Sequence, residues 1–150
     1  MSLQTERIAI ETYFFANWTA TPYGLDGQPF TPAINTVQMF IADGAVMQAS
    51  IGRTLNTYNN LGLVTFVVYT DGALGSSAWR GYAETLINLF LGKTLDATGA
   101  LVTGSGQTPL VRFSPPELGD NRQPYIGPVT LEAPLRRTNV IVPFVRYETH

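Results

Sequence analysis

The chain has 150 residues, a formal net charge of −2 and only 13% charged residues. It contains no cysteine, and its single histidine, His150, is the last residue. Disulfides and thiolate metal sites are therefore excluded, catalysis built on histidine is not expected, and the acidic balance argues against tight binding to nucleic acid. A chain of this length is expected to form one domain, residues 1–150, with a hydrophobic core.

Two further features of the composition concern location and assembly. The sequence has no apolar run of the roughly 20 residues that cross a bilayer, and its N-terminal residues lack the apolar stretch of a signal peptide. We therefore expect a soluble protein that is made in the cytoplasm. A surface poor in charge but rich in Thr, Asn, Gln, Gly and Pro is typical of a subunit whose neighbours cover it, which suggests an assembly.

Residues 3–17 are predicted to form a helix. Ile10, Phe14 and Trp18 recur at a spacing of four residues, which places them on one helical face. An alternating pattern over residues 8–14 leaves a strand as the alternative. The length of the segment favours the helix.

Residues 19–35 are predicted to be a long irregular loop. Three prolines prevent a continuous helix, and two glycines indicate turns. The loop carries Tyr23 and Phe30, which argues against plain disorder. The sequence leaves two alternatives open, an extended arm that lies on a neighbouring surface and a loop that folds back on its own core.

The next segment is predicted to be a hairpin followed by a second loop. Two runs of β-forming residues, 36–42 and 46–51, flank a tight turn at Asp43-Gly44. Residues 52–62 are polar and bounded by glycines, which predicts a loop.

A buried strand and a central helix are predicted in the middle of the chain. Residues 63–70 are apolar on both faces, as in a central strand. In residues 76–92 the large apolar residues recur every three or four positions and form one broad stripe, which predicts a buried helix. Trp79 and Tyr82 belong to this stripe and are interpreted as core anchors. Gly92 is suited to end the helix.

The C-terminal third is predicted to be rich in strands. Its short apolar runs give four strand candidates: 100–103, 110–113, 129–135 and 139–147. Residues 114–128 contain four prolines and are predicted to be a third long loop. Residues 136–138 are the expected turn between the last two strands. Pro143 cannot donate to a ladder, so the last strand is expected to be an edge strand or to be bulged there.

The predicted fold class is α+β. A mainly antiparallel sheet of five or six strands is expected to pack on the central helix at about 76–92, with the N-terminal helix at about 3–17 beside it.

No constellation of catalytic or cofactor-binding residues is evident. The eleven carboxylates are scattered, and the sequence cannot show whether two of them approach in space to act as acid and base. The glycine-rich residues 104–108 lack the lysine and the spacing of a P-loop. We therefore expect no enzymatic activity, no cofactor and no metal.

Arginine usage suggests subunit contacts instead. Eight of the nine basic residues are arginine, the side chain favoured at interfaces through bidentate pairing and stacking. Contact with nucleic acid is the alternative, but two adjacent arginines on an acidic chain are weak evidence for it. The predicted interface residues lie in the expected loops and turns: Tyr23, Phe30, Arg53, Arg122, Tyr125, Arg136 and Arg137.

Three stretches resemble a family of tailed-phage proteins, the tail terminator-like proteins related to minor tail protein U of lambda-type phages. The first is RIAIETYFFANWTATPYGLDGQPFTP at 7–32, a helix that runs into a segment rich in Pro, Tyr and Phe. The second is VQMFIADGAVMQASIG at 37–52, and the third is LVTFVVYTDGALGSSAWRGYAETLINLFLGKTL at 63–95. The C-terminal part is similar only in its strand-rich pattern.

The resemblance implies a small α+β fold and a structural role in the virion. Members of this family assemble as a homohexameric ring that caps the tail tube and binds the head-side connector, and DNA passes through the lumen without specific binding. The resemblance implies no enzymatic activity and no cofactor. It places the protein at the head-proximal end of the viral tail, after synthesis in the host cytoplasm. Another neck or tail-completion protein, or a non-viral binding module or enzyme with the same layout, remains the alternative.

Overall fold

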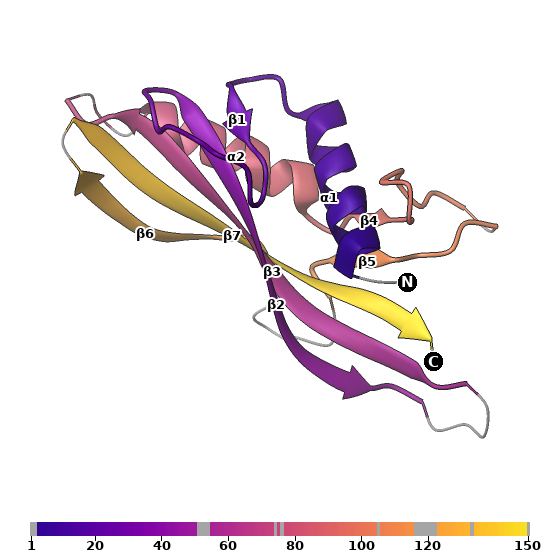
Figure 1. The fold of residues 1–150 in the computed structure, drawn as a ribbon. Helices are drawn as coiled ribbons and strands as arrows, with labels where there is room; N and C mark the ends of the chain where they lie inside the picture. Colours follow the sequence, from indigo (N-terminus) through magenta and orange to yellow (C-terminus); the bar gives the residue numbers. More distant parts are fainter. Residues whose placement is uncertain are drawn as a thin grey trace.

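The computed structural model describes residues 3–50, 55–73, 75, 77–104, 106–115, 123–132 and 134–149. Within them the chain forms two helices and seven strands (Figure 1), in this order: α1 (Leu3–Asn17), β1 (Tyr23–Gly24), β2 (Thr36–Gln48), β3 (Thr57–Asp71), α2 (Ser77–Phe90), β4 (Thr94–Leu95), β5 (Val111–Phe113), β6 (Tyr125–Glu132) and β7 (Leu135–Thr149). None of the helices described is long and apolar enough to span a membrane.

Helix α2 confirms the prediction of a buried central helix. Trp79, Ala83, Leu86 and Phe90 recur at spacings of three and four residues and are all buried. Gly92 follows the helix with a φ of 67°, the left-handed conformation that glycine adopts at little cost. The apolar stripe and the terminating glycine were sufficient to locate this element.

Helix α1 confirms the helical interpretation of residues 3–17 over the strand alternative. Its buried face contains Ile10, Tyr13 and Phe14, at the spacing that the sequence suggested. Glu6 is also buried on this helix, which the apolar pattern did not predict.

The sheet is mixed but mainly antiparallel, which confirms the α+β fold class. Its strand order is β1-β2-β3-β7-β5-β4, and β6 pairs with β7. Strands β5 and β6 follow one another along the same edge of β7, where β5 pairs with residues 144–146 and β6 with residues 135–141. Among the described strand pairs, only the two-residue pairing of β1 with β2 is parallel. Both helices lie on the same side of the long central strands (Figure 1).

The core lies between the helices and one face of strands β2, β3 and β7. An aromatic chain links the elements, with ring centroids 5.1 Å apart for Phe14 and Phe66, 5.1 Å for Phe66 and Phe90, and 4.9 Å for Phe90 and Phe113. These side chains are fully buried, and they fix both helices on the sheet.

The hairpin predicted at Asp43-Gly44 is wrong. Strand β2 continues through these residues to Gln48, with a register shift between Asp43 and Val46. The φ of Gly44 is not positive, whereas a tight two-residue hairpin turn needs positive values. The long strand β3 pairs with β2 along its whole length, so the Asp-Gly pair forms a bulge.

The predicted loop at 52–62 is accordingly too long, because residues 57–62 belong to β3. The real connection between β2 and β3 closes with a hydrogen bond from the Ala49 amide to the Thr57 carbonyl. The predicted loop at 19–35 is largely correct but contains the short strand β1. The predicted loop at 114–128 ends earlier, because β6 begins at Tyr125.

Three further C-terminal predictions also differ from the structure. Residues 136–138 are not a turn but lie within β7, and β6 ends opposite its start, where Glu132 pairs with Leu135. Residues 100–103 contain only an isolated bridge, between Leu101 and Leu95. Strand β7 is an interior strand, not an edge strand.

Pro143 is tolerated in this interior strand because of where it lies. The Pro143 carbonyl accepts a hydrogen bond from the Ser114 amide at 3.4 Å, so its backbone faces the β5 and β6 side. At this position β6 pairing has ended at Ile141 and β5 pairing begins at Phe144. The missing donor therefore falls in the gap between two successive partner strands.

Candidate subunit interface

Two of the predicted interface residues, Tyr23 and Phe30, pack within the chain. The Tyr23 ring contacts Phe14 edge-on at 5.1 Å, and the Phe30 ring lies 6.1 Å from Tyr69. The segment 19–35 therefore folds back on its own chain, one of the two alternatives that the sequence left open. Both residues are partly buried.

Three other predicted residues lie on β6 and on the part of β7 that pairs with it, with Tyr125 at one end of this ladder and the two arginines near the other. Tyr125 begins β6 and is 47% exposed. Arg136 and Arg137 pair through the backbone with Leu131 and Thr130 of β6. Neither guanidinium forms an ion pair with any described residue. This unpaired basic pair therefore flanks a strand with an exposed aromatic side chain.

Arg53 and Arg122 lie outside the described residues. The other five predicted residues divide between two sides of the sheet, with Tyr23 and Phe30 near β1 and β2, and the rest on β6 and β7.

Strand β6 forms an exposed apolar edge. We define the β6 edge as Tyr125, Ile126, Val129 and Leu131, which are 47%, 40%, 42% and 63% exposed. Among the described strands β6 pairs only with β7, so its outer backbone groups lack a strand partner. A register shift between Ile126 and Val129, at Gly127-Pro128, divides the edge into two short stretches. The strand predicted at 129–135 overlaps β6 only at residues 129–132.

The part of β2 beyond its pairing with β1 forms another exposed edge on the far side of the sheet. We define the β2 edge as Phe40, Val46 and Met47, which are 39%, 61% and 39% exposed. Strand β1 covers only two residues of β2, and the Asp26 carboxylate then accepts a hydrogen bond from the Ile41 amide at 3.1 Å. Beyond this cap no described strand pairs with the outer side of β2.

A buried ionic cluster lies where α1 meets the central strands. We define the Glu6 cluster as Glu6, Asp43, Arg146 and Glu148. The Arg146 Nε donates to Glu6 Oε1 at 3.2 Å, and its Nη1 donates to Glu148 Oε2 at 3.1 Å. The Asn60 amide also donates to Glu148 at 3.0 Å. Glu6 and Arg146 are 1% and 4% exposed, so their ion pair lies away from water, whereas Glu148 is partly buried and Asp43 is exposed.

The Glu6 cluster contains more carboxyl groups than one arginine neutralises. Burial first, and then the hydrogen bond and charge of Asp43, raise the pKa of Glu6 from 4.5 to about 8, although the charge and hydrogen bond of Arg146 lower it. Glu6 therefore holds a proton at neutral pH. Sequence reasoning missed this cluster because its acids are far apart in the chain and no local spacing reveals their contact.

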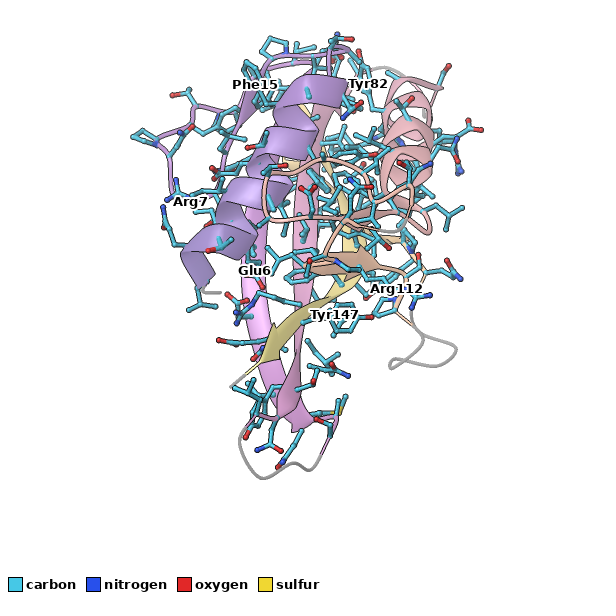
Figure 2. The ribbon with its side chains drawn as sticks, turned by 90° about the vertical axis from the view of Figure 1, so that its right-hand side faces the viewer. Glu6, Arg7, Phe15, Tyr82, Arg112 and Tyr147 are labelled. Carbon is cyan, nitrogen blue, oxygen red and sulfur yellow. The ribbon has the colours of Figure 1, made fainter. Side chains whose placement is uncertain are left out.

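The geometry gives little support to catalysis at Glu6 and Asp43. The cavity beside them measures about 170 Å³, below the roughly 300 Å³ of typical ligand pockets. A larger concavity of about 520 Å³ contains Arg112 and Tyr147, and no carboxylate is among the described residues of its lining. Figure 2 shows Glu6 and Arg7 on α1, and Arg112 and Tyr147 on β5 and β7. The described residues contain no group of three metal-ligating side chains.

Comparison with known proteins supports the fold but names no function. No protein-family model and no curated protein matches the chain. A solved structure of a protein without a functional name matches 97% of this chain and 96% of its own, with a TM-score of 0.64 and 18% identity. At this identity the similarity shows the fold alone.

Proposed function

We propose that this chain is a structural virion protein, a tail terminator. Copies form a ring, expected to be a homohexamer, that caps the tail tube and joins it to the head-side connector. Phage DNA passes through the lumen without specific binding, and the protein acts without catalysis or cofactor at the head-proximal end of the tail. The observation that carries this proposal is the resemblance of residues 7–95 to the tail terminator-like family.

Two structural observations support this role. The α+β fold with two helices on one side of a mainly antiparallel sheet agrees with the layout that the resemblance implies. The sheet also has two exposed edges on opposite sides, as a subunit with neighbours on both sides requires. A net charge of −2 suits a lumen that DNA must traverse without being held.

Electron microscopy and native mass spectrometry of the purified protein test the proposal. We expect closed rings with an open centre, and capping of purified tail tubes at one end. A protein that remains monomeric, and that neither binds tubes nor forms rings in their presence, would contradict the proposal. The alternative of a non-viral binding module or small enzyme would then be favoured.

A charge reversal tests the arginines at the proposed interface. Arg136→Glu with Arg137→Glu is expected to leave the chain folded, because both side chains are partly exposed and form no ion pair with a described residue, and to impair ring assembly. The matched control is Lys93→Glu with Arg112→Glu, which changes the net charge equally at another place. Sedimentation and melting of both variants provide the measurement. Rings that persist in the arginine variant would show that Arg136 and Arg137 do not lie at the subunit interface.

A neck or tail-completion protein at the same joint is the nearest alternative. Such a protein would bind the connector or the completed tail but would not stop the growth of tail tubes. Tube assembly in the presence of the purified protein separates the two roles, because only a terminator fixes tube length.

A further inference from the structure

The first two turns of α1 are attached to the strands through one side chain. Among residues 3–8 only Glu6 is buried, whereas Leu3 and Ile8 are 56% and 46% exposed. The buried apolar face of the helix begins at Ala9 and extends to Phe14. The attachment of these turns therefore depends on the contacts of Glu6 rather than on apolar packing.

The rest of α1 is held by contacts that do not involve Glu6. The Phe14 ring lies 5.1 Å from the Phe66 ring, inside the aromatic core. A Cβ added at Gly99 would lie 2.8 Å from the Ala9 carbonyl oxygen, so the chain before β5 packs closely on the middle of the helix. From Ala9 onward the helix thus stays anchored when the turns before it separate from the strands.

The polar groups that face Glu6 come from three strands. On β7, Arg146 donates to Glu6 at 3.2 Å and to Glu148 at 3.1 Å. On β2, Asp43 is hydrogen-bonded to Glu6. On β3, the uncharged Asn60 amide donates to Glu148. One arginine thus serves three carboxyl groups, an arrangement that is stable only while one of them keeps a proton.

Two charged groups of α1 and one of the segment before β2 lie on the solvent side of Glu6. Arg7 pairs with Glu11 at 2.9 Å, four residues later on the same helix. Asp26 adds a second negative charge that acts on Arg7, and both line the cavity of about 170 Å³ beside Glu6. The positive charge of Arg7 is therefore shared by these two carboxylates.

Separation of the first turns from the strands leaves no buried charge without a partner. When Glu6 moves into water, Arg146 keeps its ion pair with Glu148. Asp43 is already exposed, so it loses only its hydrogen bond to Glu6. The contacts that close this part of the helix can therefore break without disturbing the strands.

We propose that residues 3–8, which we name the α1 latch, form a pH-sensitive device that opens separately from the rest of α1 as the pH rises. Opening carries Glu6 into water and uncovers the ion pair between Arg146 and Glu148. This inference concerns the free chain and does not depend on the proposed function.

The direction of the pH dependence follows from the proton on Glu6. In the closed latch, burial and then Asp43 raise the pKa of Glu6 from 4.5 to about 8, whereas the open latch leaves it at its ordinary value. The open form therefore binds fewer protons between these two values. The latch is tightest below pH 4.5 and loosens as the pH rises to about 8.

Hydrogen exchange of single amides, followed by nuclear magnetic resonance, tests the α1 latch. The amides of Arg7 and Ile8 donate to helix carbonyls four residues earlier, so they exchange when the latch opens. After correction for the intrinsic pH dependence of exchange, their opening constant should rise about tenfold per pH unit, or about a hundredfold between pH 5.5 and 7.5. It should exceed the opening constant of the Phe14 amide at both pH values, because Phe14 belongs to the core.

Three variants assign the titration to the Glu6 cluster. Glu6→Gln removes the ionisable group, so its opening constant should be the same at both pH values. The matched control is Glu11→Gln, which removes another carboxylate of α1 and should keep the full rise. Asp43→Asn, at an exposed position that the fold should tolerate, removes the negative charge beside Glu6 and should reduce the rise.

Each outcome decides for or against the latch. A rise with pH that Glu6→Gln removes and Glu11→Gln retains supports it. An opening constant that does not change with pH in the parent chain overturns it. Equal opening constants for Ile8 and Phe14 also overturn it, because α1 would then open as one unit. A parental rise in both Glu6→Gln and Asp43→Asn assigns the titration to another group and rejects the inference.

Discussion

The two halves of the long strands β3 and β7 pack against helix α1 through different chemistry. In one half of β3 and β7, Phe66 lies between Phe14 and Phe90 in a fully buried aromatic cluster. In the other half, Asn60 and Arg146 face the same side, and the Glu6 cluster takes the place of the aromatic rings. Helix α1 spans both halves.

The difference shows how one helix can be anchored by two kinds of burial. The burial of aromatic rings is driven by the hydrophobic effect and involves no titratable group, so the first half should respond little to pH. The Glu6 cluster depends on specific hydrogen bonds and on the protonation of a carboxyl group, so the second half should respond to pH. The following predictions test this contrast, from the largest expected effect to the smallest.

The aromatic half is expected to be the more costly to damage. Phe66→Ala removes a fully buried ring that contacts two other rings, and it should lower the free energy of unfolding by about 3–5 kcal/mol. Chemical denaturation with urea provides the measurement. Phe15→Ala, at a ring that is 68% exposed on the same helix as Phe14, is the control and should have little effect. Similar losses in both variants would contradict the assigned core.

The ionic half is expected to weaken as pH rises. Folded Glu6 keeps its proton up to a pKa of about 8, whereas the unfolded chain releases it near 4.5. Because the unfolded state binds fewer protons between these values, the stability contributed by Glu6 is full below pH 4.5 and falls as pH rises toward 8.

Glu6→Gln should remove this dependence because the amide does not ionise. The variant should equal the parent near pH 4 and exceed its stability at pH 8 by at most about 5 kcal/mol, at 1.36 kcal/mol per pKa unit. Urea unfolding across this range provides the measurement, and Glu84→Gln on α2 is the exposed control. Parallel stability curves for parent and Glu6→Gln would show that Glu6 is ionised in the folded chain.

The boundary between the two halves is closely packed. A Cβ added at Gly62 would meet the Phe144 ring and lie 2.9 Å from the Ala42 carbonyl oxygen. Gly62→Ala should therefore destabilise the chain by about 1–3 kcal/mol. Gly81→Ala is the matched control, because nothing lies within 4 Å of its added Cβ and alanine favours the helix, so its melting temperature should rise. Equal melting temperatures of the two variants would contradict the close packing of Gly62 against Phe144 and Ala42.

One polar bond within the aromatic half gives the smallest expected effect. The Tyr13 hydroxyl donates to the Leu89 carbonyl of α2 at 2.6 Å. Tyr13→Phe should cost about 1 kcal/mol, because the ring stays packed on Phe90 while a single hydrogen bond is lost. Thermal unfolding provides the measurement. A loss as large as that of Phe66→Ala would mean that this bond, rather than the rings, fixes α1 on α2.

Residue spacing and residue type within short segments were sufficient to predict some elements of the fold. The stripe of α2 and its terminating glycine located that helix within two residues at each end. The apolar residues 63–70 were identified as a central strand because their burial on both faces leaves no polar alternation. The interface residues Tyr125, Arg136 and Arg137 were singled out by residue type, and the structure places them on the edge strand β6 and on the part of β7 that pairs with it. Their role at an interface stays a prediction.

Signals that depend on distant partners misled the sequence interpretation. Asp43-Gly44 is compatible with a hairpin turn and with a bulge, and only the length of β3 decides between them. Residues 136–138 look like a polar turn because their partners in β3 and β6 cannot be read from the sequence. The interior place of Pro143 likewise depends on the gap between β5 and β6, which no local pattern specifies.

The sequence by itself determined the two helices, the central strand, the α+β class and the low charge of the surface, because each follows from residue spacing or composition. Only the tertiary structure decided which strands are neighbours, where the sheet ends in exposed edges, and which acids meet Arg146. These properties arise from contacts between residues as far apart as Glu6 and Arg146. Their energies depend on the burial that the whole fold creates.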